Sequence, residues 1–323
     1  MIRPLLLAAA LSLAVAVPAG SADRSRRSAP PVCASCLETT VRHLAAPELN
    51  GRRCGSEDEA EAARWLAQRM RAAGLRGGFP GGAFLQPATV SIRTPPPGAP
   101  ETRTTYNVLG VLRGRARDAD RRALLLSAHY DGLGVRRGEL HPGANDDATG
   151  TAAVLEFARA LKSGGAPRRT VWFALWGCEE AGGLGARAFL ENPAFAPADL
   201  SANLEFEMVG ERDPKMPDRL MFTGWERSDL GPHLAAQGAR VGPDPYPEQN
   251  FFRRSDNYAL AQQGVVAHTI SAWPTPATYH QPTDDAAHVD FAFMAQAVRS
   301  LIGPLRRLAD GDFAPNWAAG GRP

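Results

Sequence analysis

The chain has 323 residues, of which 44% are hydrophobic, and a formal net charge of +2. This length suits one large domain or two ordinary ones, and the composition is that of a globular protein. A charge so close to neutral argues against a nucleic-acid partner, because such proteins carry a strong basic footprint.

The first 22 residues have the pattern of an export signal. Arg3 precedes a short apolar run, residues 5–17, and the small residues 19–22 offer a cleavage site. The run is too short to cross a bilayer, and no other segment of the sequence is long and apolar enough to do so. We therefore expect a linker over residues 23–32 and an exported protein, periplasmic or extracellular, without a stable membrane span after cleavage.

Four cysteines in an exported chain allow disulfides. Cys33 and Cys36 form a CxxC pair, which without a second such pair is a weak zinc-ribbon signal. We expect a structural disulfide among Cys33, Cys36 and Cys54, with Cys54 as one partner. Cys178 ends an apolar strand and is expected to be a buried free thiol.

Helices and strands alternate in the first half of the chain. A helix is expected over residues 37–44, and Ser56 and Glu59 form a capping box for a second helix that ends at Gly74. Residues 77–100 are rich in Gly and Pro and predict only short edge strands. Further strands are expected at 106–112, 124–128 and 171–176, with a helix at 148–161. The continuous apolar run 171–176 indicates burial on both faces of a parallel sheet.

The second half continues the alternation. Helices are predicted from residue 185 to before Pro193, at 229–237, from a cap at Ser255 or Asp256 to residue 262, and at 291–308. Strands are predicted at 203–209 and 265–270, and loops at 210–227, 243–247 and 273–283. This order predicts a single α/β domain over residues 33–310, followed by a flexible tail at 311–323.

Charged side chains gather where the predicted strands end, which is unusual unless they are paired or bind metal. Two histidines and several carboxylates suit zinc, which prefers nitrogen and oxygen donors. Each motif alone has an ordinary explanation, such as a helix cap or a solvated strand end. Their combination favours a metal site at the active edge of the sheet, with the ligands His129, Asp146, Glu180, Glu207 and His280.

Two metal ions need one carboxylate between them, and Asp146 is the natural bridge. Asp131, two residues beyond His129, is well placed to accept the second imidazole N–H. The neighbours Glu179 and Glu180 can reach one site only if their strand has ended in a turn. One of the two then binds metal, and the other stays free as a general base.

These motifs, in the order HYD, GANDDATG, EEAGGLGARAF, EFEMVG, RSDNYAL and YHQPTDD, resemble zinc peptidase family M28. That family includes secreted bacterial leucine aminopeptidases and glutamate carboxypeptidase. The resemblance covers about residues 37–308. It implies a three-layer αβα sandwich with a mixed, mostly parallel eight-stranded sheet and two zinc ions.

By the same resemblance, His129, Asp146 and Glu207 hold one zinc, and Asp146, Glu180 and His280 hold the other. Glu179 is then the general base, Asp131 orients His129, and Tyr279 matches a residue that helps polarise the substrate carbonyl in some members. The peptide between Asp146 and Asp147 is often cis in such proteins. Glu207 stands where the family commonly has Asp, and Glu205, two residues earlier, does not match the motif position.

The expected activity is hydrolysis of N-terminal residues from peptides by a monomer. A carboxypeptidase is an alternative, because Arg253 and Arg254 lie near the site by motif position and could bind a C-terminal carboxylate. A glutaminyl cyclase of the same clan would use a single zinc, and a catalytically inactive binding domain would bind none. The retained ligands and Glu179 favour the peptidase.

Overall fold

The computed structural model of the chain describes residues 31–93 and 99–323. The predicted export signal, and the predicted linker up to residue 30, lie outside these residues. Within the described ranges, no helix is both long enough and apolar enough to cross a membrane.

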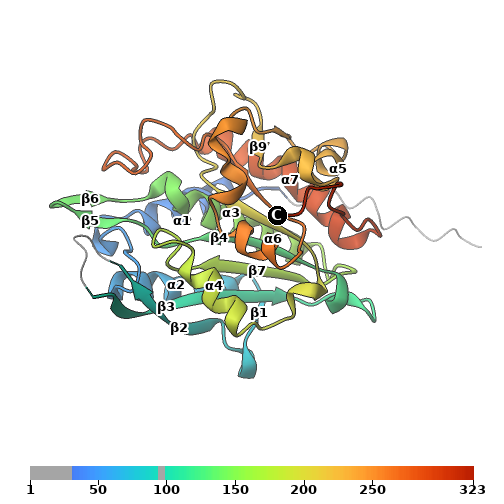
Figure 1. Cartoon of the computed structure of the whole chain (residues 1–323), viewed down its shortest axis with the longest axis horizontal. Coiled ribbons are helices and arrows are strands. Elements are labelled where there is room, and N and C mark those ends of the chain that lie inside the picture. The colour runs from blue at the N-terminus through green and yellow to red at the C-terminus, as the bar shows by residue number, and fades with distance from the viewer. Residues whose placement is uncertain (1–30, 94–98) are drawn as a thin grey trace, which may run out of the picture.

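One large mixed sheet runs through the domain in the order β1-β3-β7-β4-β8-β11-β9-β10. The four central strands β7, β4, β8 and β11 are parallel, whereas β3 is antiparallel to β7 and β9 is antiparallel to β11. The strands are β1 (Arg76–Gly77), β2 (Leu85–Ile92), β3 (Glu101–Leu112), β4 (Ala123–His129), β7 (Val171–Trp176), β8 (Leu200–Glu207), β9 (Leu220–Phe222), β10 (Val241–Pro243) and β11 (Ala267–Ser271). A separate hairpin, β5 (Gly134–Arg136) and β6 (Glu139–His141), projects from one end of the molecule (Figure 1).

The eight expected strands correspond to eight positions across this sheet. The edge position beside β3 is divided, because β1 and β2 pair with successive parts of the same strand. Leu85 of β2 pairs with Val108, and Arg76 of β1 pairs with Val111. The sheet therefore has nine strands in eight positions.

Helices cover both faces of the sheet, because successive residues of a strand point to opposite faces. Leu124 and Leu126 of β4 pack in the core that includes α1, α2, α3, α5 and α7, whereas Leu125 packs in the core that includes α4 and α6. Figure 1 shows α4 and α6 on the side of the sheet nearest the viewer. The helices are α1 (Ala34–Leu44), α2 (Glu57–Ala72), α3 (Gly150–Ser163), α4 (Leu184–Glu191), α5 (Leu230–Ala236), α6 (Asn257–Gln262) and α7 (Phe291–Asp310). The predicted αβα layering is confirmed.

Three local expectations are corrected. The Gly- and Pro-rich segment 77–100 contains β2, a strand of eight residues, since Pro87 is tolerated on an edge strand. The predicted loop 210–227 contains β9, and the next predicted loop begins inside β10. Both strands have only three residues, which is too short for a visible alternation of apolar and polar positions.

The C-terminal segment 311–323, expected to be a flexible tail, packs against the domain. Its Phe313 ring stacks on His233 with ring centroids 3.6 Å apart, and the Trp317 indole donates a hydrogen bond to Gly264 O at 3.1 Å. Contacts of these aromatic side chains hold the segment against the domain, although its Gly, Pro and Ala content suggests a mobile tail.

Candidate active site

The predicted ligands meet because parallel strands present their carboxyl ends at one edge of the sheet. His129 ends β4, Glu207 ends β8, and Glu179 and Glu180 follow β7. Asp146 lies in the kinked segment Ala144–Thr149 that leads into α3, where the backbone angles of Asp146 and Asp147 are not helical, and His280 lies in the loop after β11. The site is therefore assembled from five separate segments of the chain.

Asp146 lies between two histidines. Its Oδ1 is 3.2 Å from Nε2 of His129, and its Oδ2 is 3.2 Å from Nε2 of His280. Glu207 joins the first histidine, and Glu180 joins the second with Oε2 3.4 Å from His280 Nε2. Each group of three offers ligand atoms that all lie within 4.8 Å of one another, and Asp146 belongs to both groups.

The turn after β7 brings both glutamates to the site, as the sequence required. Asp131 accepts a hydrogen bond from Glu179 N at 2.8 Å and one from Glu180 N at 3.3 Å. The same carboxylate lies 3.5 Å from Nδ1 of His129. Asp131 thus lies beside the histidine and also holds the Glu179–Glu180 turn, a role that its spacing in the sequence does not reveal.

Three loops of the site pass through the left-handed backbone region at residues other than glycine. The φ angles are 56° at Cys178, 53° at Met208 and 57° at His280. Such conformations are uncommon for residues with a Cβ and concentrate at functional sites, where the surroundings hold them. Asp147 holds one of these loops by accepting a hydrogen bond from Met208 N at 3.0 Å, beside Glu207.

Two further residues hold the Asp146 loop, and the sequence analysis missed both as site residues. Asp284 accepts hydrogen bonds from Asn145 N at 2.6 Å and Asp146 N at 3.0 Å. Arg52 is fully buried and donates to the carbonyls of Leu44, Tyr130, Pro142 and Gly143. It thereby links the segment after His129 to the segment before Asp146. The peptide between Asp146 and Asp147 is cis, as the family resemblance implied.

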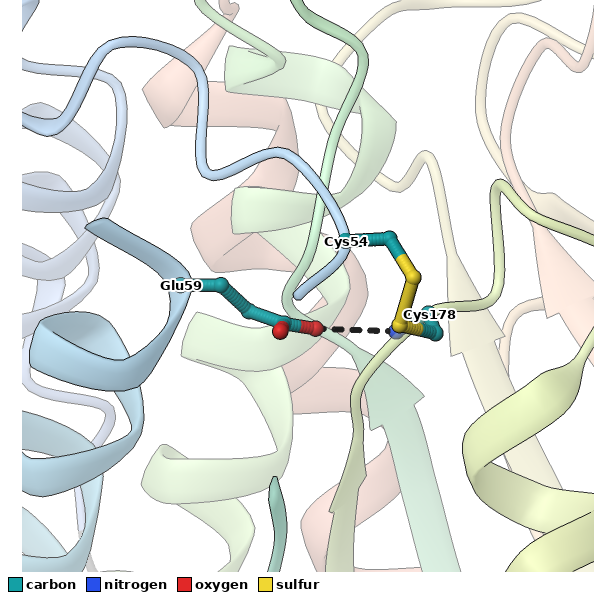
Figure 2. Close-up of side chains that lie close together, drawn as sticks. All are labelled: Cys54, Glu59 and Cys178. Carbon is teal, nitrogen blue, oxygen red and sulfur yellow. Dashed lines mark hydrogen bonds between the residues drawn. A yellow bond between two sulfur atoms is a disulfide. The ribbon is translucent and has the colours of Figure 1, made fainter. Parts of the chain in front are cut away.

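A disulfide and a buried glutamate hold the other end of the Glu179–Glu180 turn (Figure 2). Cys178 is bonded to Cys54, so the prediction of a free thiol at Cys178 is wrong. The segment before α2 therefore lies beside the end of β7. The sequence does not indicate this contact, because the two cysteines are 124 residues apart. Cys33 and Cys36 form a second disulfide, so the expected pairing of Cys54 with one of these two cysteines is also wrong.

Glu59 lies beneath that disulfide. Its carboxylate accepts hydrogen bonds from Gly55 N at 2.7 Å, Thr105 Oγ1 at 2.7 Å and Cys178 N at 3.1 Å. Ser56 caps α2 by accepting from Glu59 N at 3.1 Å, so half of the predicted capping box is present. The Glu59 side chain turns inward instead of completing the box, because these three buried donors need an acceptor.

The charge balance of the cluster fits metal ions. Burial alone would lower the pKa of His129, but the carboxylates of Asp131 and Asp146 raise it well above its usual range. Burial raises the pKa of Glu180 and of Glu207. Within the described residues, both ring nitrogens of His129 and Oε1 of Glu180 are buried without a hydrogen-bond partner. Buried carboxylates beside an unpartnered imidazole are suited to bind cations.

Comparisons with known proteins identify the family and the fold. The sequence profile of peptidase family M28 matches residues 107–302, more than half of the chain. The chain belongs to peptidase family M28. Leupeptin-inactivating enzyme 1 of Streptomyces exfoliatus is 40% identical over 74 residues, which make up 22% of this chain and 17% of that enzyme. The chain spans 14% to 18% of the length of several curated relatives of this kind.

Solved structures share the fold over most of the chain. An aminopeptidase from Aneurinibacillus sp. strain AM-1 matches with a TM-score of 0.68 and 15% identity, covering 88% of this chain and 95% of that one. A glutaminyl cyclase of Porphyromonas gingivalis matches with a TM-score of 0.62 and 17% identity, covering 85% and 98%. At these identities the likeness establishes the mixed α/β fold of an M28 domain.

Within this M28 domain, Glu207 and not Glu205 faces the ligands. Glu205 is buried on β8 and accepts a hydrogen bond from the Ser127 hydroxyl on β4. Glu207, at the end of the same strand, places a carboxylate oxygen within 4.8 Å of ligand atoms of His129 and Asp146. The longer side chain at this position therefore still reaches the group.

Asp256 is a further buried acid beside this group. The sequence analysis treated it only as a helix cap, and among the described residues its side chain makes no cap hydrogen bond. Burial raises the pKa of Asp256 to about 7. Burial also raises the pKa of Glu179 well above its usual range, and the charge of Asp256 adds to this increase. Asp256 is thus an unpredicted neighbour of the expected general base.

A small pocket and a much larger cleft adjoin the site. Next to Glu207 lies a small pocket of about 30 Å³, lined by Tyr279 and Arg254 among others, and Arg254 Nη2 donates to the Tyr279 hydroxyl at 3.4 Å. Next to Glu180 lies an open cleft of about 910 Å³. The Tyr279 ring also stacks on His280 with ring centroids 3.8 Å apart.

Proposed function

We propose that this chain is an exported zinc exopeptidase, an aminopeptidase that removes N-terminal residues from peptides. The observation that carries the proposal is the pair of three-ligand groups that share Asp146. His129, Asp146 and Glu207 would hold one zinc ion, and Asp146, Glu180 and His280 would hold the second. Zinc ions held there would polarise the scissile carbonyl and lower the pKa of the attacking water.

The chain's own residues supply the proton transfers. Glu179 lies beside the ligand Glu180 but is absent from both ligand groups, so its carboxylate is free to accept a proton from water. The same carboxyl group then returns the proton to the departing amine. Asp131 fixes the backbone of Glu179, and Tyr279 stands beside His280, where its hydroxyl can donate to the carbonyl oxygen.

The shape of the site supports action at a chain end. A pocket of about 30 Å³ beside Glu207 has room for no more than a small side chain, while the larger cleft beside Glu180 leaves room for the rest of a peptide. Two disulfides support an oxidising compartment, and hence export.

The first test is Glu179→Gln, assayed on aminoacyl nitroanilides. Loss of a general base should lower kcat by a factor of about 10² to 10⁴ while zinc content and folding stay unchanged. A folded, zinc-loaded variant with near-normal turnover would remove Glu179 from this role. Zinc content tests the ligands: Glu207→Ala should bind one zinc fewer than the parent, and Glu205→Gln should bind as much as the parent.

A carboxypeptidase is the second candidate, because Arg254 lines the pocket beside Glu207 and could bind a terminal carboxylate. A panel of peptides with free or acetylated N-termini separates the two candidates. An aminopeptidase cleaves only the free series. Cleavage of the acetylated series from its C-terminus would establish the carboxypeptidase instead.

A further inference from the structure

The open cleft beside Glu180 is basic. Four arginines line it: Arg53, Arg93, Arg136 and Arg137. Among its lining residues, all within the described ranges, Glu180 is the one acidic residue, and it is a proposed metal ligand. The chain as a whole is nearly neutral, with a formal net charge of +2, so this concentration of positive charge is local.

The arginines are free to meet a ligand. In the part of the chain that the structure describes, none of the four guanidinium groups lies within 4.0 Å of a carboxylate oxygen. By contrast, the nearby Arg103 is paired with Glu101 at 2.7 Å. Arg53, Arg136 and Arg137 are exposed, so their charges face solvent in the cleft.

The scaffold beneath the arginines is fixed. Cys54, beside Arg53, is joined to Cys178, two residues before Glu180. This disulfide packs with the side chains of Ile92 and Leu184, which also line the cleft. The cleft therefore has an apolar base and a cationic rim, and a covalent link connects the rim to the turn that carries Glu179 and Glu180.

We propose that this cleft binds the part of the substrate that follows the scissile bond, and that it selects peptides with a carboxylate close to that bond. The inference rests on the proposed aminopeptidase function. If the terminal residue occupies the small pocket beside Glu207, the remaining peptide leaves past Glu180 and enters the arginine-lined cleft. An aspartate or glutamate side chain, or the C-terminus of a very short peptide, would supply the carboxylate.

The selectivity is electrostatic and should depend on salt. Exposed ion pairs of this kind change binding by a factor of about two to five each. Raising the ionic strength from about 0.01 M to about 1 M shortens the Debye length from about 30 Å to about 3 Å, which should abolish most of the preference.

The test compares kcat/KM for matched peptides that begin with alanine. Alanyl-aspartyl-glycinamide against alanyl-asparaginyl-glycinamide measures an acidic side chain, and alanyl-diglycine against its amide measures a C-terminal carboxylate. We expect the charged member of at least one pair to be favoured three- to tenfold at low salt. The double variant Arg53→Gln/Arg136→Gln should reduce this ratio to near one, whereas Arg299→Gln, exposed on α7, should leave it unchanged.

Alanyl nitroanilide separates the two possible failures, because its leaving group carries no charge. The parent and the arginine variants should cleave it at equal rates. If the protein cleaves neither the nitroanilide nor any of the free peptides, the aminopeptidase function itself fails. If it cleaves them with no preference for charge, or with a preference that survives the arginine substitutions, the role of the cleft is wrong.

Discussion

Removal of the Cys54–Cys178 disulfide should destabilise the protein far more than removal of Cys33–Cys36. The first disulfide joins residues 124 apart in sequence and the second joins residues 3 apart. A cross-link lowers the conformational entropy of the unfolded chain by an amount that increases with the logarithm of the number of residues in the closed loop. In that model the long loop contributes roughly 5 kcal/mol and the short loop roughly 2 kcal/mol.

The assay is urea unfolding of two double variants, Cys54→Ala/Cys178→Ala and Cys33→Ala/Cys36→Ala, in metal-free buffer. Alanine at both positions avoids a free thiol, and the absence of zinc avoids stabilisation by ligand binding. We expect the free energy of unfolding to fall by about 3 kcal/mol more for the first variant than for the second. Equal losses, or a larger loss for Cys33–Cys36, would refute the reasoning from loop length.

Two other predictions concern buried groups. Glu59→Gln puts an amide NH₂ where a carboxylate oxygen accepts buried hydrogen bonds. The substitution should therefore lower the free energy of unfolding by about 1–3 kcal/mol and also lower kcat. The control is Glu57→Gln, an exposed position on the same helix, and equal effects of the two substitutions would contradict the argument. His268 is buried, and burial lowers its pKa to about 4 from 6.5. The unfolded chain therefore takes up the proton first, and stability should be lost as pH falls from 6.5 to 4, by about 3 kcal/mol in urea titrations. The substitution His268→Gln should reduce the pH dependence of the free energy of unfolding between pH 6.5 and 4. The control His288→Gln, at an exposed position, should leave this pH dependence unchanged.

Most of the fold could be predicted because its central strands are apolar on both faces and its helices alternate with them. The expected strand at 171–176 is β7, and the expected helix at 291–308 is α7 within two residues. The peripheral strands could not be predicted in the same way. β1, β9 and β10 have two or three residues each, and only their pairing with neighbouring strands defines them.

The candidate ligands could be named from the sequence because each follows a strand or opens a helix within a recognisable motif. The residues that hold these candidate ligands in place could not be predicted from the sequence. Arg52 and Glu59 bond to backbone groups of distant segments, such as Tyr130 O and Cys178 N. Because residues of every type carry these backbone groups, a sequence pattern does not indicate which of them will be bonded. The same limit explains the error at Cys178, since only the folded chain brings it to Cys54.

The turn after β7 is where stability and catalysis meet. It carries the proposed base and one proposed ligand, and three separate groups restrain it: the disulfide at Cys178, the Glu59 carboxylate bonded to Cys178 N, and Asp131 beside the proposed metal ligands. When one restraint is lost, the other two remain. At temperatures where the variant stays folded, the loss in kcat, expressed as an activation free energy, should therefore be smaller than the loss in the free energy of unfolding. The disulfide also connects this turn to Arg53, so any displacement of the turn is shared with the cleft that we propose for acidic peptides. Catalytic rate and selectivity for charge should therefore change together when Cys54–Cys178 is removed, and independently when the arginines alone are replaced.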